Sequence, residues 1–169
     1  REASLELADT LRMEYDIPTM VETVEGFIAM DEFAEVPGFD VNDLKGANDV
    51  LGHDAGDELI RGAAKCISET FNKVGNCYRT GGDEFIVVAQ AEEMEIARLC
   101  QMFEKNTTNW TGKIVEKLRV SYGYASVNEF PEDDFTSIQK IADKRLYENK
   151  RQFYSMEGND RRGQRNVFQ

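Results

Sequence analysis

Two short stretches of this sequence combine carboxylates with glycines at places where a strand is expected to end. The first runs Asp40-Val41-Asn42-Asp43-Leu44-Lys45-Gly46-Ala47-Asn48-Asp49 and continues into Gly52-His53-Asp54-Ala55-Gly56-Asp57; the second is Arg79-Thr80-Gly81-Gly82-Asp83-Glu84-Phe85. Carboxylates that are brought together repel one another unless a cation lies among them. Mg²⁺ suits such a place because it binds one or two carboxylates together with phosphate oxygens. These residue types therefore predict a site for Mg²⁺ and a nucleoside triphosphate, in which lysines neutralise phosphate and Gly-Gly lets backbone amides approach it.

The first stretch lies between an expected strand and an expected helix. Residues 39–42 are typical of the end of a short buried strand, although its apolar lead-in, Val36 before Pro37, is brief for a central strand. Apolar residues then recur at helical spacing over residues 57–71, where Asp57 would cap or open the helix.

The second stretch has the pattern of a β-hairpin. Residues 76–79 and 85–89 are rich in aromatic and β-branched types and flank Gly81-Gly82, which indicates a turn that requires positive φ. Such a hairpin presents Asp83 and Glu84 at its tip.

The remaining elements alternate between helix and strand, so a mixed α/β fold is expected. We expect further helices over about 3–13, 19–33, 92–105 and 135–152, and a strand over about 118–127. The helix over 19–33 has Thr19 as N-cap and Glu22 to complete a capping box.

Length and composition limit the class of protein. The chain has 169 residues, 41% hydrophobic and 31% charged, which suits one packed domain. A net charge of −12 argues against nucleic-acid binding through phosphates. No apolar run reaches bilayer length and no secretory pattern opens the chain; because it does not begin with Met, we expect an upstream segment. The three widely spaced cysteines, Cys66, Cys77 and Cys100, are expected to be reduced core thiols in a reducing compartment.

The two stretches together resemble the signatures of one family. The second reads G-G-D-E-F, the motif of the GGDEF (diguanylate cyclase) domain. The first is similar to that family's D-x-x-x-x-K-x-x-N-D-x-x-G-H-x-x-G-D signature, with matches at Asp40, Lys45, Asn48, Asp49, Gly52, His53, Gly56 and Asp57. The resemblance runs from about Asp16 to Lys150. It implies a nucleotidyl-cyclase-like α/β fold with a central, mostly antiparallel sheet flanked by helices, and condensation of two GTP into cyclic di-GMP with release of pyrophosphate.

The resemblance also implies roles for individual residues. Magnesium, or manganese in its place, would be held by Asp40, Asp83, Glu84 and the carbonyl of Val41. Glu84 is either a metal ligand or the base for the 3′-hydroxyl, and Lys45 would stabilise the phosphates in the transition state. Asn48 and Asp57 would read guanine, with His53 in the same pocket. The remaining substrate contacts would come from Leu44, Gly81, Gly82 and, at the terminal phosphates, Lys150.

Three departures from the family pattern stand out. Phe153-Tyr154 occupies the place of a common Gly-Arg-Asn, with Arg165-Asn166 as the substitute further on. The R-x-x-D product site would fall on Phe71-Asn72-Lys73-Val74 and is absent, so no feedback is expected there. The early D-x-L-T-G-L-x-N-R motif survives only in part over residues 16–24.

The resemblance divides the chain and implies its partners. Residues 1–15 would end a connecting or signalling helix, 16–152 would form the GGDEF domain, and 153–169 a polar tail. A homodimer partner is implied because each domain holds one GTP. The resemblance also implies an N-terminal sensor or receiver domain, and a bacterial signalling protein whose present piece lies in the cytoplasm and which is soluble or membrane-bound through another part. No nucleic acid and no membrane contact are expected of this piece.

Simpler interpretations stay open at this point. Asn48, Asp49 and Asp57 are also typical helix caps, and His53 and Lys150 are also ordinary surface residues. At the level of function, the alternatives are an impaired GGDEF module that binds GTP and signals by contact, and an unrelated magnesium phosphohydrolase.

Overall fold

A four-stranded antiparallel sheet forms the centre of the protein. The computed structural model describes residues 2–17 and 35–156. The strands are β1 (Glu35–Val41), β2 (Gly75–Arg79), β3 (Glu84–Ala89) and β4 (Val120–Ser126). They lie in the order β2-β3-β1-β4, and every neighbouring pair is antiparallel. The expected antiparallel sheet flanked by helices is therefore confirmed.

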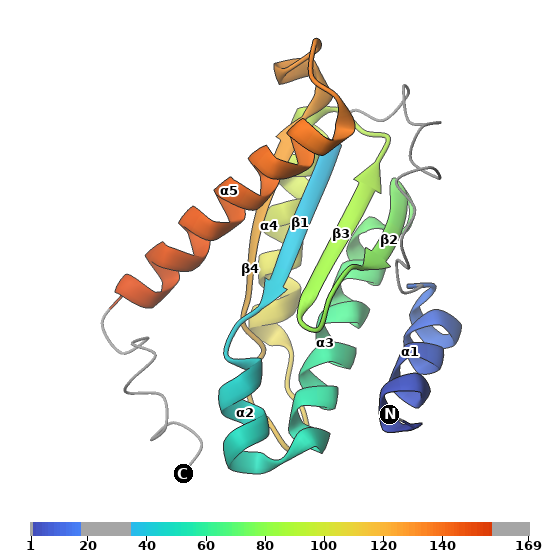
Figure 1. The fold of residues 1–169 in the computed structure, drawn as a ribbon, viewed down its shortest axis with the longest axis vertical. Coiled ribbons are helices and arrows are strands. Elements are labelled where there is room, and N and C mark those ends of the chain that lie inside the picture. The colour runs from blue at the N-terminus through green and yellow to red at the C-terminus, as the bar shows by residue number, and fades with distance from the viewer. Residues whose placement is uncertain (1, 18–34, 157–169) are drawn as a thin grey trace.

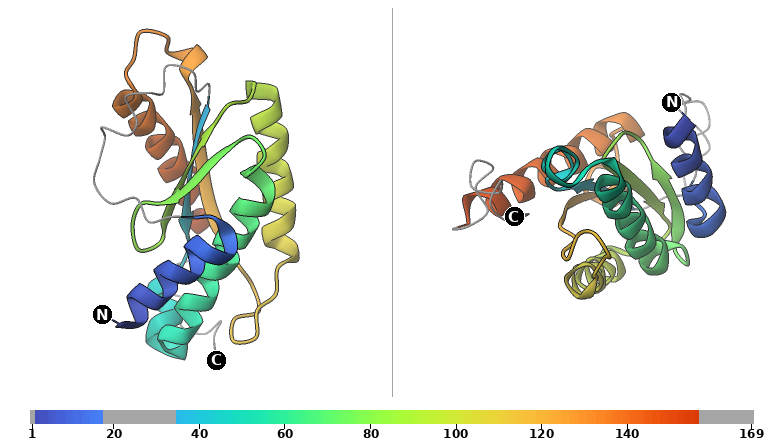
Figure 2. Two further views of the ribbon diagram at one scale, coloured as in Figure 1. Left: turned by 90° about the vertical axis from the view of Figure 1, so that its right-hand side faces the viewer. Right: turned by 90° about the horizontal axis from the view of Figure 1, so that it is seen from below.

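Helices cover both faces of this sheet (Figures 1 and 2). They are α1 (Glu2–Tyr15), α2 (Leu44–Leu51), α3 (His53–Phe71), α4 (Glu93–Asn109) and α5 (Phe135–Ser155), with a short 3₁₀ helix, η2 (Val127–Glu129). α3 and α4 pack side by side on one face, and α5 crosses the other face alone. α1 packs against α3, and α2 lies beyond the end of β1. No helix of the described part is both long and apolar enough to cross a bilayer.

The main core lies between the sheet and the α3–α4 layer. Phe39 of β1 contacts Phe71 of α3 and Phe103 of α4, with ring centroids 5.4 and 4.8 Å apart. Leu7 and Leu11 of α1 belong to the same cluster, which makes the first helix part of the folded unit. The apolar spacing over 57–71 thus predicted a buried helix face correctly.

The three cysteines are buried in this part of the protein and form no disulfide, as the sequence indicates. Burial raises the pKa of the Cys66 thiol to about 11 and that of the Cys77 and Cys100 thiols to about 12. All three therefore stay protonated and unreactive at neutral pH.

α5 lies unusually close to β4 because Gly123 carries no side chain. A Cβ at Gly123 would stand 2.2 Å from the backbone nitrogen of Leu146 and 2.6 Å from the carbonyl oxygen of Ala142. Gly38, its register partner on β1, is less crowded, with the nearest atom 3.7 Å from the corresponding position. Gly123 thus sets the distance between helix and sheet.

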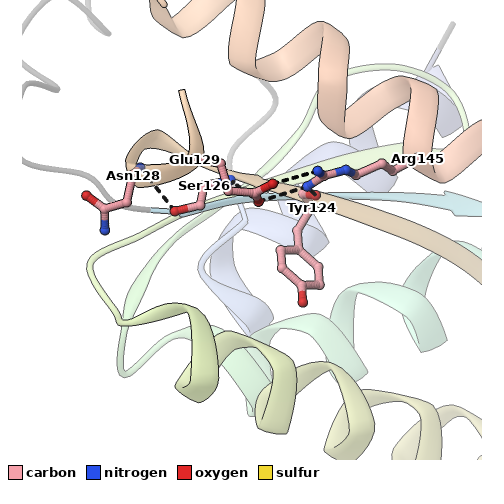
Figure 3. A network of polar contacts seen from close by, with 5 residues as sticks. All are labelled: Tyr124, Ser126, Asn128, Glu129 and Arg145. Atoms are coloured by element: carbon pink, nitrogen blue, oxygen red, sulfur yellow. Dashed lines mark hydrogen bonds and ion pairs between the residues drawn. The ribbon is translucent and has the colours of Figure 1, made fainter. Parts of the chain in front are cut away.

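Arg145 then fixes α5 along the strand (Figure 3). Its guanidinium donates to both carboxylate oxygens of Glu129, at 2.9 and 2.7 Å, and to the carbonyl oxygen of Tyr124 at 2.9 Å. Glu129 is itself held because it completes a capping box with Ser126 at the start of η2. One turn further along α5, the Asn149 side chain accepts a hydrogen bond from the Tyr122 amide at 3.2 Å.

The short buried strand expected to end near residues 39–42 is β1, which begins at Glu35 and passes through Pro37. At Pro37 the ladder to β3 is interrupted while that to β4 continues, since proline has no N–H to donate. The expectation for Asp57 was wrong. Asp57 lies inside α3, which begins at His53, so Asp57 neither caps nor opens the helix.

The glycine turn and one helix also differ from expectation. Gly81 and Gly82 lack positive φ; among the described glycines that conformation occurs at Gly52, which joins α2 to α3. The helix α2 was not anticipated, because its apolar residues are too few to give a clear period. The helix expected at 19–33 and the tail from 157 lie outside the described residues, and α5 continues to Ser155.

Glu35 is a fully buried carboxyl group at the start of β1. Neither of its carboxylate oxygens has a hydrogen-bond partner within the described residues. Burial raises its pKa above the ordinary 4.5, and repulsion from Glu93 and Glu129 adds to this, whereas Ser126 and Arg145 oppose it. The native fold therefore favours the protonated form of Glu35.

We expect Gly123→Ala to destabilise the fold by about 1–3 kcal/mol, because the new methyl group forces α5 away from β4. Gly38→Ala is the matched control, since it adds the same methyl group in the same register but meets only ordinary contacts. Urea unfolding of both variants measures the difference; equal midpoints would contradict the close approach.

We expect Glu35→Gln to change how stability depends on pH. Above pH 4.5 the unfolded chain releases the Glu35 proton, whereas the native state still holds it because its pKa is raised. In this pH range the unfolding free energy of the unchanged protein therefore falls as pH rises. Glutamine does not titrate, so the variant lacks this contribution. Urea titrations between about pH 4.5 and pH 8 should show the variant gaining stability relative to the parent; a constant difference would contradict a raised pKa.

Candidate active site

The end of β1 and the start of β3 lie side by side at one end of the sheet, on its two central strands. Asp40 of β1 is the register partner of Glu84, the first residue of β3. One residue further, the Val41 amide donates to the carbonyl oxygen of Asp83 at 2.9 Å. The two carboxylate-bearing stretches of the sequence are therefore neighbours in space, although 43 positions separate Asp40 from Asp83.

A pocket of about 380 Å³ opens between this region and α5. Its walls include Asp40 and Glu84 from the sheet, together with Asp143, Tyr147 and Lys150 from α5. The α5 residues recur every three or four positions, so they share one helix face. The other lining residues are Gly38, Phe39, Thr80, Phe85, Ile86, Gln139, Ala142 and Leu146.

An ion pair joins the two walls of this pocket. The Lys150 Nζ atom lies 2.6 Å from Oδ1 of Asp40, and the two side chains are only 19% and 10% exposed. A charge-assisted hydrogen bond of this length and burial is stronger than a surface ion pair.

The pocket nevertheless has a surplus of negative charge. The pKa of Glu84 is raised, first by partial desolvation and then by repulsion from Asp83, Asp40 and Asp143, and Lys150 opposes the effect. Desolvation also raises the pKa of Asp143. Three carboxylates thus line a pocket to which one lysine contributes, and an added cation would relieve their repulsion.

The donor atoms fit a magnesium ion. Asp40 and Glu84 offer hard carboxylate oxygens from adjacent strands, and the pocket leaves room for phosphate oxygens and water to complete the coordination shell. Within the described residues, no three Asp, Glu, His or Cys side chains are already grouped to hold a metal. A nucleotide would have to supply the remaining ligands, which is usual for Mg²⁺.

Asn48 of α2 has a buried oxygen that lacks a partner. Its amide lies directly over Gly56 of α3, whose missing Cβ would stand 2.1 Å from the Asn48 Oδ1 atom. That oxygen forms no hydrogen bond with any described residue. Asp57, the neighbour of Gly56, is half-buried. Its negative charge raises the pKa of Arg79, but the burial of Arg79 itself has the larger effect and lowers that pKa overall. Because the Asn48 oxygen is buried, its amide would have to rotate before a ligand N–H group could satisfy it.

The other residues that the sequence singled out lie around this centre rather than in the pocket wall. Lys45 and His53 are exposed near the starts of α2 and α3, and Leu44 is half-buried against the core. Gly82 is exposed at the hairpin tip and has no atom within 4 Å of its Cβ position. At Gly81 a Cβ would lie 3.0 Å from the Glu84 carboxylate. The structure therefore groups Asp40, Glu84 and Lys150 in one pocket, and leaves Lys45 and His53 facing solvent.

Sequence reasoning missed two residues. Arg79 donates from Nε to the Gly81 carbonyl at 3.1 Å and from Nη2 to the Gly82 carbonyl at 2.7 Å, and so shapes the hairpin tip. Its position two residues before Gly-Gly was the available signal. Asp143 lines the pocket two turns before Lys150, and the seven-residue spacing indicated a shared face.

Residues 34–155 match the family model described as "Diguanylate cyclase, GGDEF domain". The chain belongs to the GGDEF domain family. It is 32% identical over 117 residues to diguanylate cyclase DosC of Escherichia coli (strain K12); the aligned region covers 66% of this chain and 25% of DosC. It is 34% identical over 116 residues to diguanylate cyclase A of Treponema denticola (strain ATCC 35405); the aligned region covers 66% of this chain and 31% of that protein. The chain thus spans a quarter to a third of these curated relatives.

Solved structures share the fold. The GGDEF domain of DgcB from Caulobacter crescentus, in complex with c-di-GMP, has a TM-score of 0.65 at 24% identity, covering 90% of this chain and 85% of that one. Diguanylate cyclase SiaD from Pseudomonas aeruginosa, in complex with its activator SiaC, has a TM-score of 0.69 at 18% identity, and the match covers 89% of this chain and 62% of that one.

We expect Arg79→Ala to loosen the hairpin tip, because two carbonyl acceptors lose their donor. The Thr80 and Gly81 amides, which both donate to the Glu84 carbonyl, should exchange with solvent about tenfold faster, as one or two lost hydrogen bonds allow. Hydrogen exchange measures this, with Lys73→Ala, an exposed cation before β2, as the control. Unchanged protection would contradict the role of Arg79.

Proposed function

We propose that this chain is a magnesium-dependent diguanylate cyclase domain, which condenses two GTP into cyclic di-GMP and releases two pyrophosphates. The observation that carries the proposal is the register of β1 and β3, which sets Asp40 beside Glu84 in a pocket with surplus negative charge. Membership of the GGDEF family supplies the reaction.

In this proposal Asp40, Asp83, Glu84 and the Val41 carbonyl hold the metal. Bound Mg²⁺ supplies Lewis-acid stabilisation of the charge that develops on the α-phosphate and the leaving pyrophosphate. Lys45 and Lys150 neutralise phosphate oxygens, and Gly81 and Gly82 leave the hairpin backbone open to them. Glu84 serves either as a metal ligand or as the base that takes the 3′-hydroxyl proton.

Asn48 and Asp57 recognise guanine in this proposal. The Asn48 amide, whose oxygen is buried and has no partner among the described residues, rotates to accept from the exocyclic amine, and the Asp57 carboxylate accepts from N1–H and that amine. Adenine has neither group at these positions, so the pair favours GTP over ATP. Leu44 and His53 contact the bound nucleotide beside them in this proposal.

The reaction requires two copies of the domain. Each copy binds one GTP and presents its 3′-hydroxyl to the α-phosphate held by the other, which a two-fold dimer achieves most simply. A sensor or receiver domain upstream of α1 would control how the copies meet. We place the protein in the bacterial cytoplasm, as a soluble protein or as the cytoplasmic part of a membrane-bound one.

One observation favours a second candidate, a module that binds GTP and signals by contact. Phe153 and Tyr154 stand within α5 where many family members carry a Gly-Arg-Asn, and Phe153 packs against Arg119, whose Cζ lies 5.6 Å from the ring centroid. A clamp arginine is therefore missing from that stretch.

We expect the protein, incubated with GTP and Mg²⁺, to yield cyclic di-GMP at a rate that rises faster than linearly with protein concentration when dilute. Asp40→Asn and Glu84→Gln should each lower the rate at least about a hundredfold, because charge on the transferring phosphate loses its counter-ion. Chromatography of the nucleotides measures the product, with Glu116→Gln, an exposed loop carboxylate, as the control.

Other results would identify the alternatives. GTP binding without turnover at high protein concentration would favour the binding module. Turnover that is linear in protein and gives no cyclic product would favour a phosphohydrolase.

We expect Asp57→Asn to weaken binding of a non-hydrolysable GTP analogue about 10- to 100-fold, because an acceptor for N1–H becomes a donor. ATP-analogue affinity should not fall in parallel. Calorimetry measures both, and Asp54→Asn, an exposed carboxylate in the first turn of α3, is the matched control. An equal loss for both nucleotides would contradict guanine reading by Asp57.

A further inference from the structure

The ammonium group of Lys150 lies where positive charge is most needed in the pocket. It contacts Asp40 at 2.6 Å, and its charge also lowers the pKa of Glu84, the register partner of Asp40. A cation shared by Asp40 and Glu84 would lie close to the Lys150 ammonium group. The positive charge of Lys150 would repel that cation, and its hydrogen bond already uses part of the electron density that Asp40 could offer to a metal.

We propose that Lys150 is a built-in counter-ion that competes with the divalent cation for Asp40, so that the metal binds weakly until a nucleotide draws Lys150 away. This inference rests on the proposed function, since it concerns the same metal site. Nucleotide phosphates offer Lys150 a new anionic partner, and their arrival removes the Lys150 charge from beside Asp40. Metal and nucleotide therefore promote each other's binding, a coupling that is reciprocal by thermodynamic necessity.

The burial of the pair makes this competition effective. Lys150 and Asp40 are 19% and 10% exposed, so solvent and salt screen their attraction far less than that of a surface pair. Removing Lys150 would take a positive charge from beside a largely buried carboxylate, which raises the affinity of that carboxylate for another cation.

The scaffold holds the backbone that carries Lys150, whereas the side chain itself has four rotatable carbon–carbon bonds. Asn149, the preceding residue, is tied to the Tyr122 amide, and Arg145 is tied to Glu129. The backbone of α5 is thus fixed to β4, and a change of rotamer along the four-carbon lysine side chain is enough to release Asp40.

Manganese binding to the nucleotide-free protein tests the proposal, by electron paramagnetic resonance of free Mn²⁺. Lys150→Met should bind Mn²⁺ at least tenfold more tightly than the parent chain. Lys144→Met, which removes an exposed lysine from the same helix, should stay within about twofold of the parent, because a distant exposed charge is screened. Adding Asp40→Asn to Lys150→Met should abolish the gain.

Equal Mn²⁺ affinity of Lys150→Met and the parent would overturn the proposal, and so would an equal gain in Lys144→Met. Should Lys150→Met fail to fold, the unchanged chain provides the test by nuclear magnetic resonance. Added Mg²⁺ should shift the Lys150 ammonium signal and leave that of Lys144 in place; an unaffected Lys150 signal would overturn the proposal.

The outcome is separable from that of the proposed function. If the parent makes no cyclic di-GMP but Lys150→Met binds Mn²⁺ more tightly, the competition by Lys150 is supported and the cyclase activity is contradicted. If the parent makes cyclic di-GMP but Lys150→Met binds Mn²⁺ no more tightly, the cyclase activity is supported and the competition is contradicted.

Discussion

Antiparallel pairing of β1 with β3 sets Asp40 and Glu84 side by side, and much of the structure accommodates the repulsion between them. The Val41–Asp83 backbone hydrogen bond continues the pairing beyond the strand and brings a third acidic residue to the same place. Such an arrangement costs free energy in the isolated domain. Its persistence is understandable when a cation belongs there, and Lys150 provides one from within the chain.

The helix that carries Lys150 is therefore as much a part of the site as the strands are. Its distance from the sheet depends on Gly123, and its position along β4 depends on Arg145. Neither residue touches the pocket. A change at either would move Asp143 and Lys150 together relative to Asp40, so the electrostatics of the site depend on how α5 packs against β4 and η2.

Much of the fold was predictable because its signals are local. The apolar period of α3 and the β-rich runs on both sides of Gly81-Gly82 are evident in short windows of sequence. The short helix α2 was missed because eight residues give too little period. Pro37 made the lead-in of β1 brief for a central strand, yet the seven-residue strand pairs with neighbours on both sides.

Some residues of the candidate site could likewise be identified from the sequence, and others could not. The carboxylates and glycines were identified from their types and spacing. The contact between Lys150 and Asp40 was not, since it joins residues 110 positions apart and follows from where α5 crosses the sheet. Arg79 was missed because its function is to hold the backbone carbonyls of Gly81 and Gly82, and a sequence does not display such contacts.

The hydrogen bonds that hold α5 against β4 also occupy backbone groups on the open edge of the sheet. β4 is an edge strand, and its Tyr122 amide and Tyr124 carbonyl point away from β1 toward side chains of α5, which already occupy them. Free groups of this kind invite an incoming strand and lead to aggregation. At these two positions a neighbouring molecule meets a helix rather than open backbone, so self-association there cannot proceed by extension of the sheet.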